Sequence, residues 1–143
     1  MHAAHHGNAA IELVLAAPLL LVMLAGIVNV GYALREAMLV QNAAEAGALY
    51  AAEHGWDAAG ISAAVTGSAG SVAIMAAPAP AQLCGCPGPV GVIVAACASA
   101  CPSGGSPGVY IRISAALAHQ QIVPYLGFGV PATLTGESLV RVQ

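Results

Sequence analysis

The four cysteines are the densest group of reactive side chains in the sequence. One residue separates Cys84 from Cys86, and three residues separate Cys97 from Cys101. Four thiolates can hold zinc in a tetrahedral site, but structural zinc sites usually use cysteine pairs separated by two residues. A redox pair would need the same spacing. An even number of clustered cysteines in a small domain instead favours two structural disulfides outside the cytoplasm.

The spacing also limits how these cysteines can pair. On a helix, Cys97 and Cys101 would have Cβ atoms about 5–6 Å apart, whereas a disulfide needs about 3.5–4.5 Å. Cys84 and Cys86 are so close in sequence that a bridge between them would strain the backbone. We therefore expect each of the first two cysteines to pair with one of the last two. Nested and crossed orders both remain open.

A single carboxylate, Glu12, stands at the start of a long apolar run. Residues Leu13 to Leu34 contain no Asp, Glu, Lys or Arg. As a helix, this run is about 33 Å long, enough to cross a hydrocarbon core of about 30 Å. A charge beside such a span is costly and usually has a functional partner.

Gly7 offers a candidate cleavage site before this carboxylate. Cleavage after Gly7 would make Asn8 the new N-terminus. Asn8 and Glu12 would then lie four residues apart on one face of the helix. The Glu12 carboxylate would thereby be placed to pair with its own α-ammonium group or with that of an adjacent subunit.

The composition excludes several classes of protein. Of the 143 residues, 59% are hydrophobic and only 6% are charged, and the formal net charge is −3. Such a chain is too apolar to be disordered and carries too few charges for an ordinary cytosolic domain. It contains no lysine and no basic run, so we expect no nucleic-acid partner.

Catalytic chemistry has little support in the sequence. The five histidines stand beside no obvious nucleophile, and phosphate-binding loops, nucleophile elbows and metalloprotease motifs are absent. We therefore expect a protein that is not an enzyme and that needs no cofactor or metal. The histidines are His2, His5, His6, His54 and His119.

The elements that position these groups begin with one long helix, which we expect from about Ala9 to His54. Pro18 lies inside it and predicts a kink, because proline removes a backbone hydrogen bond and clashes with the preceding turn. Gly55 would end this helix. Asp57 would then N-cap a short second helix that runs to about Val65.

The second half of the chain has β signals. We expect a strand over residues 71–77, and then a loop, opening at Pro78, that holds all four cysteines. This loop contains at most a short strand, in the apolar island from Val90 to Ala96. A half-buried strand is predicted from Val109 to about His119, because apolar residues alternate with others there. Residues 124–131 form a turn-rich connection to a strand over 134–142. The last two strands would pair in an antiparallel manner, which makes the fold class α+β with a small antiparallel sheet.

Four segments follow from these patterns: a leader (1–7), a transmembrane helix (8–35), its continuation outside the membrane (36–55) and a small exported α+β domain (56–143). The apolar run is longer than the core of a secretory signal, and the leader lacks Lys and Arg. A retained membrane anchor, with an extracytoplasmic C-terminal domain, is therefore expected instead of a cleaved signal peptide.

The stretch from Gly7 to Gly55 resembles the TadE-like family of the Tad (Flp) pilus system and, more broadly, type IV pilin-like proteins. The resemblance is carried by Gly7, Glu12, Pro18, Gly31 and the alanine-rich segment over 42–52. It implies a minor pilin or pseudopilin that is cut by a prepilin peptidase between Gly7 and Asn8. Glu12 would then recruit or register the subunit by pairing with a neighbour's N-terminus.

The same resemblance implies the partners: the major pilin, other minor pilins and the membrane assembly platform. The chain departs from the family in three ways. Its leader has only histidines where the family is basic, Leu13 follows Glu12 where major pilins often have tyrosine, and Leu49 replaces a common arginine. The two leucines favour a minor or divergent member over the main fibre subunit. The alternatives are a membrane-anchored extracytoplasmic binding domain unrelated to pili and, third, a zinc-binding domain facing the cytoplasm.

Overall fold

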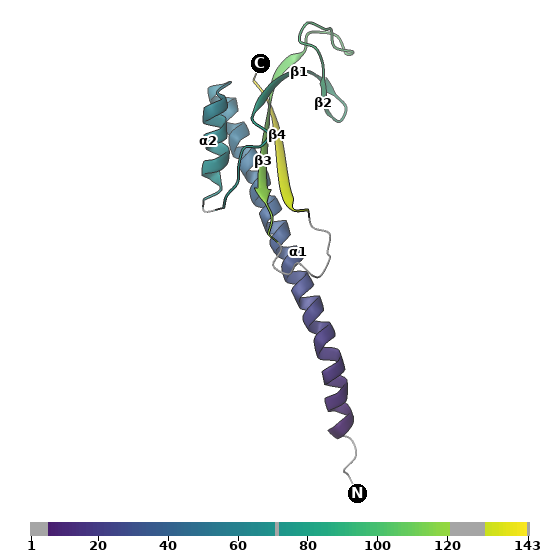
Figure 1. Ribbon diagram of the computed structural model, residues 1–143. Coiled ribbons are helices and arrows are strands. Elements are labelled where there is room, and N and C mark those ends of the chain that lie inside the picture. Colours follow the sequence, from purple (N-terminus) through teal and green to yellow (C-terminus); the bar gives the residue numbers. More distant parts are fainter. Residues whose placement is uncertain (1–5, 71, 121–130, 143) are drawn as a thin grey trace.

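The computed structural model describes residues 6–70, 72–120 and 131–142. A single helix, α1 (His6–His54), forms the long axis of the molecule. Its first half extends beyond the rest of the chain, while a second helix and a sheet pack against its second half (Figure 1). Most of the predicted connection over 124–131 and most of the predicted leader lie outside the described residues.

α1 is helical along its whole length because alanine and leucine dominate it, and both are strong helix formers. The helix continues without interruption through Pro18, so the kink there stays a prediction. It ends at His54, where the Gly55 N–H donates to the Ala51 carbonyl at 2.9 Å. Gly55 takes a φ of 75°, the left-handed conformation that suits a glycine after a helix.

The short helix α2 (Ala58–Ser68) has the predicted start but ends three residues later than expected. The Asp57 side chain accepts a hydrogen bond from the Ala59 N–H at 3.2 Å, which confirms the N-cap. Ile61 and Val65 are one turn apart on the same face, and both are fully buried. This apolar face fixes α2 beside the outer half of α1.

Within the described ranges, four strands form one antiparallel sheet with the order β2-β1-β3-β4. β3 (Gly108–Ala118) and β4 (Thr133–Arg141) pair over nine residues, from Tyr110↔Arg141 to Ala118↔Thr133. β1 (Ala81–Gly88) pairs with the start of β3 and forms a tight hairpin with β2 (Gly91–Val94). The α+β class and the antiparallel pairing of the last two strands are therefore confirmed.

Two expectations about the middle of the chain were wrong. Of the predicted strand over 71–77, the described residues 72–77 contribute only an isolated bridge between Met75 and Ala116. The predicted cysteine loop allowed a short strand within 90–96, where β2 lies, but Cys84 and Cys86 lie within a further strand, β1. Glycine and proline in this segment indicated a loop, but hydrogen bonding to two neighbouring strands overrides that local preference.

β3 is also more buried than its alternating pattern indicated. Arg112 is exposed as expected, but Tyr110 and Ser114, which alternate with the apolar residues, are 7% and 8% exposed. β3 is a central strand with β1 and β4 on its two sides. An alternating pattern predicts that one face of the strand is buried and the other is exposed. A central strand can instead have both of its faces covered.

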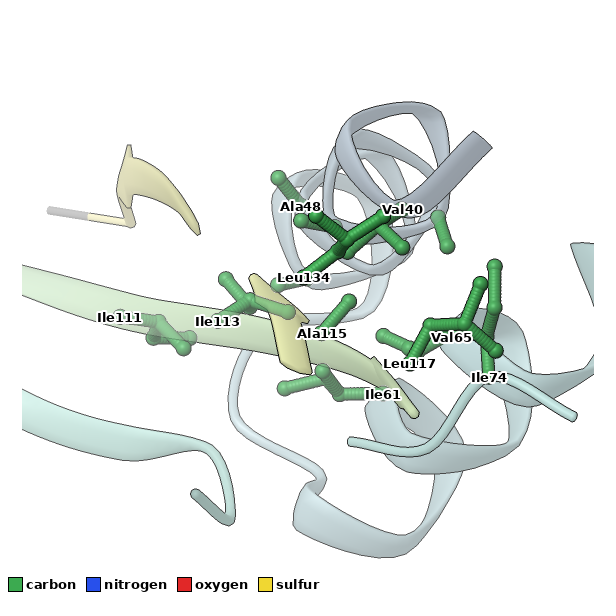
Figure 2. Close-up of a cluster of buried hydrophobic side chains, with 13 residues drawn as sticks. Val40, Ala48, Ile61, Val65, Ile74, Ile111, Ile113, Ala115, Leu117 and Leu134 are labelled. Atoms are coloured by element: carbon green, nitrogen blue, oxygen red, sulfur yellow. The ribbon is translucent and has the colours of Figure 1, made fainter. Parts of the chain in front are cut away.

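The main core lies between the outer half of α1, α2 and one face of β3 (Figure 2). α1 contributes small side chains, so the other elements approach it closely. A Cβ atom at Gly47 would lie only 2.7 Å from Val65 Cγ2 and 2.9 Å from Ile113 Cγ2. The larger members of this core are Val40, Ile61, Val65, Ile74, Ile111, Ile113, Leu117 and Leu134.

Candidate functional site

The first half of α1 is exposed although it is strongly apolar. Leu15 is 74% exposed, Leu20 62% and Ile27 67%. Large apolar side chains in a continuous exposed patch mark a surface that meets membrane or protein. Among the described residues, α1 is the one helix long and apolar enough to cross a membrane by length and composition. It is therefore a candidate membrane anchor.

Glu12 lies near the start of this apolar surface. Its side chain is exposed, and it has no hydrogen-bond or ion-pair partner among the described residues. Gly7, Asn8 and Glu12 all lie on α1, since the helix begins at His6. The four-residue spacing of Asn8 and Glu12 places their Cα atoms about 6 Å apart along the helix axis. A carboxylate exposed in this way is available to a cation from outside the chain.

The apolar half of α1 carries a shallow groove of about 670 Å³. Its lining has no charged side chain among the described residues. Gly26 and Gly31 lie in this lining, and because they lack side chains the groove is deeper there. Glycines on a membrane helix allow a second helix to approach closely. The residues that line the groove are Val22, Met23, Gly26, Ile27, Val30, Gly31 and Leu34.

A buried polar contact joins α1 to the sheet just beyond the apolar run. His119 Nδ1, in the residue that follows β3, lies 2.5 Å from Glu36 Oε2. The His119 side chain is fully buried and that of Glu36 is only 10% exposed. The Tyr32 ring packs beside the imidazole, with 6.4 Å between the ring centroids. A buried pair of this kind ties the domain to a defined turn of α1.

The cysteine cluster forms two disulfides in the crossed order. Cys84 pairs with Cys97 and Cys86 pairs with Cys101. No free cysteine is present among the described residues. The two bonds fasten the loop after β2 to the middle of β1, so the hairpin and the loop form one cross-linked unit. Of the two pairings that the spacing left open, the structure contains the crossed one.

The outer end of α1 carries a polar cluster. The Tyr50 hydroxyl donates to Asp57 Oδ2 at 3.1 Å, and the Tyr50 and His54 rings stack with centroids 4.3 Å apart. Hydrogen bonds hold the pKa of the Asp57 carboxyl below its usual value. The one from the Gly60 backbone N–H contributes most, and the one from the Tyr50 hydroxyl contributes next. The same Tyr50–Asp57 hydrogen bond raises the pKa of Tyr50. Capping of α2 accounts for the place of Asp57 in this cluster.

Sequence reasoning missed the Glu36–His119 pair. The two residues are 83 positions apart, and each reads by itself as an ordinary polar residue at the end of an element. One signal was present: Glu36 follows directly after Arg35 at the end of an apolar run, where a single carboxylate needs a partner. The sequence contains no indication that this partner is His119.

The described residues bring no catalytic or metal-binding constellation together. No group of three or more His, Cys, Asp or Glu side chains among them is placed to hold a metal ion. All four cysteines are consumed by disulfides. The alternative of a zinc-binding domain therefore has no candidate metal site within the part of the chain that the structure describes.

Residues 7–49 match the model of a protein family described as TadE-like protein. The matched segment starts at Gly7 and covers Glu12, Pro18 and most of α1. It agrees with the family that the sequence resembles. No curated protein and no solved structure matches the chain.

Proposed function

We propose that this protein is a minor pilin or pseudopilin of a Tad (Flp) type IV pilus. The match of residues 7–49 to the TadE-like family points to a protein associated with the Tad pilus. Within that segment, one observation carries the proposal: an exposed carboxylate without a partner in the described chain, Glu12, stands at the start of an exposed apolar helix. The role is structural, and the chain is the substrate of a peptidase instead of an enzyme.

The mechanism follows from the cost of exposing apolar surface and charge. Before assembly, α1 lies in the inner membrane, where its leucines and valines are surrounded by lipid. A prepilin peptidase cuts between Gly7 and Asn8 and so creates an α-ammonium group four residues before Glu12. In the assembled pilus or its base, helices of other subunits replace the lipid. The Glu12 charge is then offset only when a neighbour's N-terminus lies beside it, which fixes the register between subunits.

This proposal assigns the partners and the location. The chain is a single-pass protein of the inner membrane with its disulfide-linked domain outside the cytoplasm, where thiols are oxidised. It meets the membrane assembly platform, the major pilin and other minor pilins, and it takes part in pilus assembly, initiation or adhesion. The groove along α1 supplies a surface for a neighbouring helix.

The first test is the intact mass and the N-terminal sequence of the protein isolated from its native membrane without reduction. A chain that begins at Asn8 and is about 4 Da lighter than its reduced form, because each disulfide removes two hydrogens, would support the proposal. A chain that retains Met1 to Gly7 would remove the processing step. The better reading would then be a membrane-anchored binding domain unrelated to pili.

The second test replaces Glu12. Glu12→Ala should block incorporation into the pilus and leave insertion into the membrane intact, because the apolar run is unchanged. Glu53→Ala is the matched control, since Glu53 is also an exposed carboxylate on α1 but lies outside the apolar run. Normal incorporation of Glu12→Ala would contradict the assigned role of the carboxylate.

A further inference from the structure

α1 presents two different faces along its length, one covered by its own domain and one open. Successive helix residues are rotated by about 100°. Asn29, Ala33, Val40 and Ala51 are buried, and the helix period places them within roughly 40° of one another. This face, which runs from inside the apolar segment to the outer end of α1, is the one that the rest of the chain occupies.

The open face lies roughly 140° away around the helix. It includes Ile27 and Leu34 in the apolar half and Leu49 in the outer half, which are 67%, 61% and 67% exposed. Met38, 62% exposed, lies between them on the same face. The open face is therefore one continuous strip that passes from the membrane segment onto the exported domain.

Each half of this strip carries a groove. In the apolar half lies the groove of about 670 Å³ already described. In the outer half, a second groove of about 280 Å³ lies between α1 and β4. Ala48, Leu49 and Ala52 form its helix side and Leu139 its strand side, with Glu45 at the polar edge. Small residues on the helix keep this second groove open to an elongated occupant.

The chemical character of the strip indicates what kind of partner can bind along it. Over the apolar half, the occupant has to be uncharged, because burying a charge against such a surface without a partner is costly. Over the outer half, Glu45 is the charged residue of the lining, so a cation is favoured there. A helix with an uncharged apolar run followed directly by a cation fits both halves.

α1 itself has that pattern. Its uncharged run ends at Leu34, and Arg35 follows directly as the single Arg or Lys of the helix. Arg35 is exposed and has no ion-pair partner among the described residues. Glu45 is also exposed and contacts Gln41 through a hydrogen bond of 3.2 Å. The two charges that one copy leaves without an ionic partner thus complement each other between two copies.

We propose that the open face of α1 receives α1 of a second copy of this chain, displaced outward so that its Arg35 meets Glu45. The proposal rests on the proposed pilus function and goes further by naming the face and the partner. Arg35 and Glu45 are ten residues apart, so the neighbour is shifted by about 15 Å along the helix. Two copies anchored at the same depth in one bilayer do not reach this register. It forms when one copy has been drawn outward, as in a staggered filament.

This contact is separate from the one made by Glu12. Pairing of Glu12 with a neighbour's N-terminus needs a shift of four residues, about 6 Å. In a staggered array each subunit has several neighbours at increasing shifts, so the two contacts involve different neighbours. Loss of one contact is therefore distinguishable from loss of the other.

Photo-crosslinking in the native pilus-producing cells tests the proposal. The cross-linking residue p-benzoylphenylalanine is placed at position 49, in the outer groove, and a second copy with a different tag is co-expressed. The same residue at position 66 is the matched control, because Thr66 is exposed on α2, away from the open face. We expect position 49 to give a product that contains both tags and position 66 to give none.

Charge reversal then tests the register. Arg35→Glu in the tagged second copy, or Glu45→Arg in the copy with the cross-linker, should each reduce the product by about tenfold, because like charges then meet. The two substitutions together, one in each copy, should restore the yield. Circular dichroism and membrane fractionation show that each variant folds and inserts.

The outcomes separate this proposal from the function on which it rests. A product with another pilin, no product, or no recovery in the combined variants would overturn the homotypic contact. If the chain is still processed after Gly7 and still requires Glu12, the pilus function stands without it. A chain that is neither processed nor recovered with pili would overturn both.

Discussion

Glu36 Oε2 and His119 Nδ1 lie 2.5 Å apart in a buried contact between α1 and the end of β3. His119 Nε2, the other ring nitrogen, is buried and has no hydrogen-bond partner among the described residues. The imidazole therefore depends on Glu36 for its polar contact. The pair lies two residues beyond the uncharged run, so it joins the membrane helix to the exported domain at their boundary.

Removal of one member of this pair should destabilise the domain. Glu36→Ala leaves the buried imidazole without its hydrogen-bond partner, and a buried polar group left unsatisfied typically costs about 1–3 kcal/mol. The free energy of unfolding of the full chain in detergent micelles, measured by urea titration, checks this. The double variant Glu36→Leu with His119→Leu should be much closer to the original protein, because an apolar pair leaves no unsatisfied group. Equal losses in the single and double variants would show that the pair is not the cause.

Gly136 should not tolerate a side chain. A Cβ atom there would lie 2.9 Å from the Gln41 N and Cα atoms and from the Val40 carbonyl oxygen, which are all backbone atoms of α1. Gly136→Ala should therefore push β4 away from α1 and cost about 1–3 kcal/mol. Thermal unfolding followed by circular dichroism measures the change.

The matched control for that substitution is Gly67→Ala. Gly67 lies inside α2, and a Cβ atom there would meet nothing within 4 Å. Because alanine is the better helix former, this variant should be unchanged or more stable by up to about 1 kcal/mol. A loss of stability equal to that of Gly136→Ala would contradict the close-approach explanation.

The two disulfides should differ in their rates of reduction. Cys86 and Cys101 are both buried, whereas Cys97, the partner of Cys84, is exposed. Thiol–disulfide exchange needs access to a sulfur atom, so Cys84–Cys97 should open first under a mild reductant. Alkylation followed by peptide mass spectrometry gives the order. Faster labelling of Cys86 and Cys101 would contradict it.

Full reduction should loosen the hairpin and the loop after β2. Each bond closes a short loop, and the usual contribution of such a bond is about 2–4 kcal/mol. Limited proteolysis should therefore cut the region from Cys84 to Cys101 faster after reduction. Unchanged resistance to protease would show that strand pairing holds this region without the disulfides.

The cap of α2 should depend on pH in a defined direction. The pKa of Asp57 is lowered in the folded chain, so its contribution to stability is present above the ordinary Asp value and is lost as pH falls through the lowered pKa. Tyr50→Phe removes one of the hydrogen bonds that lower this pKa. The pKa of Asp57 should then rise, so the pH-dependent contribution of its carboxylate to stability should be smaller, and its loss should be complete at a higher pH.

A carbon-13 NMR titration of the Asp57 carboxyl measures this rise in pKa. Glu53→Gln is the control, because it removes an exposed carboxylate nearby without touching the Tyr50–Asp57 hydrogen bond. An unchanged Asp57 titration in Tyr50→Phe would mean that the hydroxyl does not stabilise the carboxylate.

The sequence by itself determined the features that depend on local chemistry. The uncharged run from Leu13 to Leu34 predicts a long apolar helix because helix length and hydropathy are properties of adjacent residues. Asp57 predicts the N-cap of α2 because capping needs only the next few backbone N–H groups. The spacing of the cysteines restricted their pairing for the same reason.

Only the tertiary structure decided the relationships between distant residues. Glycine and proline around Cys84 indicated a loop, but hydrogen bonding to β3 and β2 made this segment a strand. The crossed order of the disulfides follows from where the loop after β2 returns to β1. Glu36 meets His119 because β3 ends beside one turn of α1. Such contacts depend on how the elements pack in space, and the residue pattern within each element does not contain that information.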